Sequence, residues 1–129
     1  MAVSRTSLSA GEIIRAVLLE DPEVAARTNK IFPVATDRAD LPYILYRRTQ
    51  LEQATIKGRQ GADTVGIEVL CYTKGYTEGI ELAEAVRAAL DSKQGEIDGL
   101  VMRSCFLSDS EEAWQDDAYL QQLVFTVKM

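Results

Sequence analysis

The sequence predicts an α+β fold, in which a mostly antiparallel sheet of about four strands carries two main helices packed on one face. The first observation is a change of period within residues 64–90: apolar residues alternate up to position 72 and recur at helical spacing from position 77 to position 90. The second is the order of elements, which is helix, strand, strand, helix, strand, strand. The third is that hairpin-length connections join the strands and make neighbours antiparallel.

The first helix is predicted over residues 7–20. Ser9 and Glu12 have the spacing of a capping box, in which two side chains satisfy free backbone N–H groups at a helix start. Leu8 and Ile13 are placed to form the hydrophobic staple that accompanies such a start. The apolar residues that follow recur at helical spacing, so we expect one side of this helix to be buried.

A corner and a short apolar segment follow this helix. Asp21 suits the cap, and Pro22 the first turn, of a second helical piece over residues 22–28. Residues 30–34 are mostly apolar, but Pro33 lacks a backbone N–H and restricts them to an edge strand or a loop. We therefore expect two helices that meet at a corner before the main sheet begins.

Four segments supply the predicted strands: residues 43–51, 64–72, 100–107 and 118–129. The first is rich in aromatic and branched residues, and the last alternates apolar with polar positions. Residues 53–63 between the first two strands contain two glycines and two basic residues, so we expect a flexible hairpin connection with a basic tip. No repeat, linker or composition change divides the chain, which predicts a single domain over residues 1–129.

Composition narrows the classes of function. The 129 residues carry a net charge of −6, which argues against general attraction to nucleic acid or anionic lipid. No signal peptide or membrane-length apolar run is present, so we expect a soluble, unexported protein. The absence of histidine excludes His-based triads and zinc sites, and the glycines match no phosphate-binding fingerprint. Cys71 and Cys105 suit either two reduced core thiols or a disulfide between adjacent strands.

Residues 108–117, SDSEEAWQDD, are predicted to form an acidic loop around the single tryptophan, Trp114. A divalent cation site and a carboxylate pair for acid–base catalysis are alternatives to a simple solvated loop. The segment lacks the spacing and glycine of an EF-hand, and no partner nucleophile accompanies the carboxylates. We therefore predict no catalytic residue, no metal and no cofactor. The acidic residues are Asp109, Glu111, Glu112, Asp116 and Asp117.

The sequence also contains a basic group, separate from the acidic residues. A protein with separate positive and negative patches can associate head to tail with its own copies, and contacts that close make rings. The alternative is that these are scattered surface charges. Trp114 suits an interface, because tryptophan is enriched in binding hot spots, or an anchor for its own loop. The basic residues are Arg47, Arg48, Lys57 and Arg59.

The order of segments resembles the small tail-completion or tail-terminator proteins of long-tailed, siphovirus-like bacteriophages and prophages. The matching segments are KIFP at 30–33, LPYILY at 41–46, the block at 61–90 and LVFTVKM at 123–129. The resemblance implies non-enzymatic α+β subunits in a hexameric ring that caps the head-proximal end of the tail tube and offers a surface for head joining. It also implies three partners: further copies of the chain, the tail tube protein and a head-completion protein.

By the same resemblance, the protein is expected in the virion tail and, during assembly, in the host cytoplasm. The charged residues and Trp114 are then candidate subunit or tube contacts, an assignment that rests on charge and not on a family motif. A head–tail connector or minor tail subunit of similar fold is the alternative within phage structure. Two further alternatives are not phage structural proteins: a small carboxylate-dependent hydrolase and a partner-binding module of a host operon.

Overall fold

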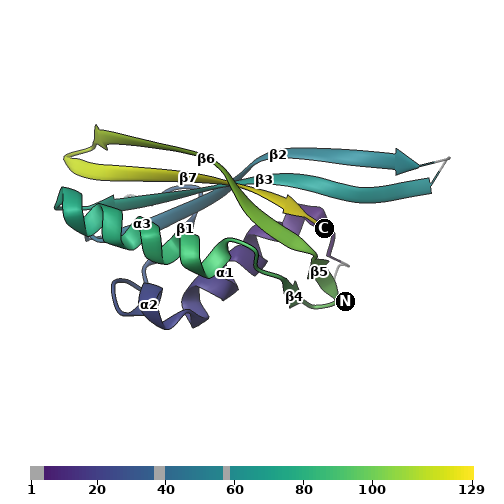
Figure 1. Ribbon diagram of the computed structural model, residues 1–129, viewed down its shortest axis with the longest axis horizontal. Helices are drawn as coiled ribbons and strands as arrows, with labels where there is room; N and C mark the ends of the chain where they lie inside the picture. The colour runs from purple at the N-terminus through teal and green to yellow at the C-terminus, as the bar shows by residue number, and fades with distance from the viewer. Residues whose placement is uncertain (1–4, 37–39, 57–58) are drawn as a thin grey trace.

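The main sheet is mostly antiparallel, and its strand order is β1-β2-β3-β7-β6 (Figure 1). The computed structural model describes residues 5–36, 40–56 and 59–129, except for the side chains of 54–56 and 59–62. In these residues β1 pairs parallel with β2, the other pairs are antiparallel, and β4 and β5 form a separate small sheet. The strands are β1 (Ile31–Pro33), β2 (Tyr43–Ile56), β3 (Arg59–Thr73), β4 (Gly95–Ile97), β5 (Leu100–Met102), β6 (Ser104–Gln115) and β7 (Ala118–Lys128).

The helices lie below the sheet in the view of Figure 1. The longest, α3, packs on β3 and β7, whereas α1 contacts β2 together with α3 and β4. The α+β class and the mostly antiparallel sheet are confirmed. The expected four strands and two helices need correction, because the described residues contain five strands in the main sheet, a second sheet and a helical layer that includes α2. The helices are η1 (Ser7–Ser9), α1 (Ala10–Glu20), α2 (Pro22–Ala25) and α3 (Tyr76–Leu90).

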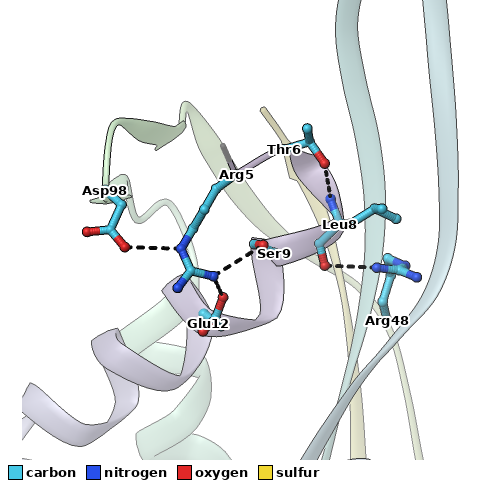
Figure 2. A network of polar contacts seen from close by, with 7 residues as sticks. All are labelled: Arg5, Thr6, Leu8, Ser9, Glu12, Arg48 and Asp98. Atoms are coloured by element: carbon cyan, nitrogen blue, oxygen red, sulfur yellow. Dashed lines mark hydrogen bonds and ion pairs between the residues drawn. The ribbon is translucent and has the colours of Figure 1, made fainter. Parts of the chain in front are cut away.

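The start of α1 differs from the predicted capping box. The chain enters through a 3₁₀ turn, which is capped by Thr6 accepting a hydrogen bond from the Leu8 N–H at 3.3 Å. Ser9 has φ −93° and ψ 9°, outside the extended conformation of a capping residue, and makes no side-chain cap bond. Both Ser9 and Glu12 instead accept hydrogen bonds from Arg5 (Figure 2). Leu8 is exposed, so the predicted staple is absent too.

The corner after α1 follows the prediction. The Asp21 carboxylate accepts hydrogen bonds from the backbone N–H groups of Glu23 at 3.0 Å and Val24 at 3.1 Å. Pro22 occupies the first turn, where the missing N–H costs no helical bond. The helix ends at Ala25 and not at the predicted position 28. The segment before β2 is an edge strand, as Pro33 required.

The hairpin of β2 and β3 is longer than predicted. Residues 53–63, expected as a connection, belong largely to the strands, whose register pairs Thr55 with Gln60 and Ile56 with Arg59. Lys57 and Gly58 lie outside the described residues. The polar composition of residues 53–63 suggested a loop. However, two paired strands can be held by backbone hydrogen bonds without a buried face, so polar residues are compatible with this hairpin. In Figure 1 the hairpin extends well beyond the helices.

The end of the chain also differs from the prediction. The predicted strand over 100–107 is divided between β5 and β6. The predicted acidic loop over 108–117 is mostly strand, since β6 runs to Gln115. The reversal occurs at Asp116 and Asp117, whose φ angles of 55° and 59° are those of a two-residue type I′ turn. Both sides of β6 are exposed over much of its length, so it shows no alternation of apolar residues.

The main core lies between the helices and the sheet. Val65, Ile67, Val69 and Cys71 of β3 are fully buried, as their alternation predicted. Cys105 is buried in the same cluster, and both cysteines are free thiols, so the reduced-thiol alternative is confirmed. Within the part of the chain that the structure describes, no helix combines the length and apolar character needed to cross a membrane.

Candidate protein-binding surface

The face of the sheet opposite the helices carries a second apolar cluster. Leu45, Tyr72, Ala118 and Leu120 are buried there, and no helical residue of the described chain belongs to the cluster. The cross-strand pairs of the register bring these side chains together, and the rings of Tyr43 and Tyr72 stack with centroids 4.9 Å apart. The cluster adjoins a concave surface of about 590 Å³. Tyr43 and Leu70 of the same cluster are only partly buried and line this concavity together with polar residues, so it is a candidate protein interaction surface.

Arg47 lies beside this concave surface and is paired within its own chain. Its guanidinium donates to Glu68, directly opposite on β3, with an N–O distance of 3.3 Å. The side chain of Glu68 is only 9% exposed, whereas that of Arg47 is 52% exposed. Arg47 therefore compensates a nearly buried carboxylate and still presents part of its surface to solvent.

Arg48 lies on the opposite face, because successive side chains of a strand alternate. Its guanidinium donates to the backbone carbonyl of Leu8 at 2.8 Å and so ties β2 to the turn before α1 (Figure 2). Lys57 lies outside the described residues, and the side chain of Arg59 is not described. The structure thus separates Arg47 from Arg48 instead of bringing them into one patch.

The same alternation distributes the acidic residues. Glu111 lines the concave surface on the open face, while Glu112 and Trp114 point to the side of the helices. Asp116 and Asp117 form the turn. Within the described residues, no group of three or more His, Cys, Asp or Glu side chains is placed to hold a metal ion. The carboxylates instead give the β6–β7 hairpin negative charge on both faces and at its end.

Aromatic rings gather on the helical side of this hairpin. The Trp114 ring meets the Tyr119 ring edge to face at 4.9 Å, and Tyr119 meets Tyr76 of α3 in the same way at 5.8 Å. Trp114 nevertheless remains 60% exposed. It therefore contacts its own chain and also offers a large apolar surface to a partner, so the two alternatives for this residue are compatible.

Glu112 sits against these rings and is held in place. Its Oε2 accepts hydrogen bonds from the Tyr76 hydroxyl and from the Gln121 side-chain amide, both at 2.9 Å. The hydrogen bond from Gln121, and to a smaller extent that from Tyr76, lowers the pKa of Glu112. The hydrogen bond to Glu112 in turn raises the pKa of Tyr76. At neutral pH the pair is therefore a carboxylate and a neutral phenol. We call the concave site of about 250 Å³ formed by Tyr76, Glu112, Ala113, Trp114, Tyr119 and Gln121 the Trp114 pocket.

Sequence reasoning missed most of this pocket. Tyr76 and Gln121 are ordinary residues in ordinary segments, and only the fold places them beside Glu112. One signal was present: two adjacent aspartates tolerate positive φ and suit a two-residue hairpin turn. A turn there puts Trp114 opposite Tyr119, as the observed register does. That turn also converts the supposed loop into a strand.

Comparison with known proteins identifies the family. A family model described as "Tail completion protein gp17" matches residues 12–129, which is nearly the whole chain. The chain belongs to this family. It is therefore a structural, virion-associated protein of the phage tail, and the resemblance drawn from its segments is confirmed. No curated protein matches the chain.

The fold is also found in solved structures. A chain of the structure titled "Virion of native gene transfer agent (GTA) particle" aligns with a TM-score of 0.80 at 17% identity, covering 95% of this chain and 98% of that one. A second solved chain aligns with a TM-score of 0.54 at 14% identity, covering 92% and 94%. At these identities the likeness shows a shared fold over almost the full length.

Proposed function

We propose that the chain forms a closed, hexameric ring that ends the tail tube at its head-proximal side and presents the surface to which the head joins. Membership of a tail completion family supports a role at the end of tail assembly. The near-complete fold likeness to a chain of a gene transfer agent virion supports incorporation into a particle. Its partners are then copies of itself, the tail tube protein and a head-completion protein.

The observation that carries the ring is the placement of the two hairpins. The β2–β3 and β6–β7 hairpins end at opposite ends of the molecule (Figure 1). Residues 53–63, at the end of the β2–β3 hairpin, contain two basic residues and one acidic residue, whereas residues 108–122 contain five acidic and no basic residues. Opposite charges at opposite ends favour heterologous, head-to-tail contacts, which form a ring when the rotation closes.

The open face of the sheet supplies the second requirement of such an interface. The members of its apolar cluster that are only partly buried, such as Tyr43 and Leu70, would gain hydrophobic stabilisation from contact with a neighbour. Charged groups then set orientation, and the apolar face supplies affinity. We assign the ten predicted contact residues to these interfaces: Arg47, Arg48, Lys57, Arg59, Asp109, Glu111, Glu112, Trp114, Asp116 and Asp117.

Electron microscopy of tails carrying a labelled copy of the chain tests the proposed position. We expect the label at the head-proximal end of the tail tube, and tubes of uncontrolled length when the chain is omitted from assembly. Label at the tail tip would instead indicate a minor tail subunit, and label on the portal a head–tail connector. Either location would overturn the terminator function.

A further inference from the structure

The Trp114 pocket combines an oriented carboxylate with exposed aromatic rings. Both described hydrogen bonds to Glu112 end on the same oxygen, Oε2, and both come from neutral donors. Among the described residues, Glu112 takes part in no ion pair with a lysine or arginine. The carboxylate is thus fixed in direction while its charge lacks a cationic partner in the described chain.

The surroundings of Glu112 select the class of group that completes the site. Trp114 and Tyr76 are the exposed aromatic residues beside the carboxylate, with exposed fractions of 60% and 47%. The negative faces of such rings attract cations, tryptophan most strongly. Arginine suits this combination, because its planar guanidinium stacks on a ring while donating hydrogen bonds to a carboxylate.

We propose that the Trp114 pocket receives an arginine side chain from the basic segment 53–63 of a second copy of this chain. This rests on the proposed ring, in which the β2–β3 hairpin of one subunit meets the β6–β7 hairpin of the next. The segment contains Lys57 and Arg59, and residues 108–122 of the receiving hairpin contain five acidic and no basic residues. The arginine stacks on Trp114 and donates to Glu112, while the neighbouring carboxylates attract the approaching segment.

The chain provides its own reporter, since Trp114 is its single tryptophan. The experiment titrates the dilute full-length protein with a synthetic peptide of residues 53–63 and follows tryptophan fluorescence. We expect a saturable change that is lost when Arg59 of the peptide is replaced by alanine. The Glu112→Gln protein should bind the peptide about fivefold more weakly, because it loses the charge-assisted hydrogen bond between the guanidinium and the carboxylate.

A matched control separates this site from general charge attraction. Glu96→Gln removes the same charge from an exposed position of β4, outside both hairpins and the Trp114 pocket, and should leave peptide affinity unchanged within about twofold. Equal weakening by the two substitutions, or no saturable response of the unmodified protein, would overturn the proposal. Circular dichroism of each variant verifies the fold.

The proposed ring can fail independently of the pocket. A hexameric particle mass together with no peptide response would reject the arginine contact and leave the ring intact. Peptide binding that depends on Glu112, together with a monomeric mass even when tail tubes are added, would reject the ring and retain the pocket as a binding site for a basic segment.

Discussion

Burial suppresses the chemistry of the two cysteines. Desolvation raises the pKa of both the Cys71 and Cys105 thiols from the usual 9.0 to about 12, with Asp91 contributing at Cys105. The thiolate is the reactive form of cysteine, and almost none is present in the folded protein at pH 8. The two residues therefore act as small apolar side chains of the core.

We expect neither thiol of the folded protein to react with Ellman's reagent at pH 8 on the timescale of minutes, and both to react in denaturant. Because unfolding lowers these pKa values, the free energy of unfolding should fall as pH rises above about 9. The rate of reaction with Ellman's reagent, with the unfolded chain as the control, measures thiol reactivity. Urea titrations at pH 7 and pH 10 measure the change in the free energy of unfolding. Rapid reaction of the native protein would contradict the burial of these groups.

Contact between α3 and the sheet depends on a small residue. A Cβ atom at position 79 would lie 2.8 Å from Oγ1 of Thr73 and 3.6 Å from Cγ of Gln121. Thr73 has little freedom to move, since it is fully buried and its hydroxyl donates to the Gly75 carbonyl at 2.8 Å. Gly79 is therefore required by packing, although glycine inside a helix is intrinsically unfavourable.

Gly79→Ala should accordingly destabilise the protein by about 1–2 kcal/mol, because overpacking outweighs the gain of about 1 kcal/mol in helix propensity. Gly75→Ser is the matched control: its Cβ meets a heavy atom of Glu78 only at 3.9 Å, and a serine at the N-cap changes stability by a few tenths of a kcal/mol. Urea unfolding followed by circular dichroism measures both. Stabilisation by Gly79→Ala would show that α3 does not pack as closely as described.

Elements with one buried face were predictable, and elements with two exposed faces were not. The alternation of apolar residues around Val69, and their helical spacing after it, arise because one face of each element is buried against the core. Burial of one face makes apolar residues recur at a regular spacing in the sequence. Trp114 and Glu112 lie in an exposed edge strand, where hydrogen bonds to β7 and the turn at Asp116 maintain the backbone. Such a strand leaves no hydrophobic period, so its composition alone suggested a loop.

The candidate site was predictable in its chemistry and not in its geometry. Acidic residues and the single tryptophan marked the segment, but its division between two faces depends on strand formation. Arg47 and Arg48 illustrate the same limit: neighbours in sequence, they bind Glu68 on one face and the Leu8 carbonyl on the other. The pairing of Glu112 with Tyr76 joins residues 36 positions apart, and only the packing of α3 on the sheet produces it.

At the scale of the whole molecule, two forces act on association. The apolar cluster of the open face favours contact at any ionic strength, whereas the charged hairpins at opposite ends act over about one Debye length, roughly 10 Å at 0.1 M salt. Salt therefore separates the two contributions. The charges give direction to the contact, and direction decides whether copies close into a ring.

We expect the solution mass from light scattering to approach six times the 14.3 kDa chain as concentration rises at low salt, and to fall when salt is added. Asp116→Asn with Asp117→Asn should weaken assembly, because it removes two of the five carboxylates of residues 108–122 while leaving the turn tolerant of positive φ. Glu20→Gln with Glu96→Gln is the matched control, since both residues are exposed and lie outside the two hairpins. A hexamer indifferent to salt and to the aspartate substitutions would show that the apolar face alone holds the ring. A monomer under all conditions, tail tubes included, would contradict self-assembly altogether.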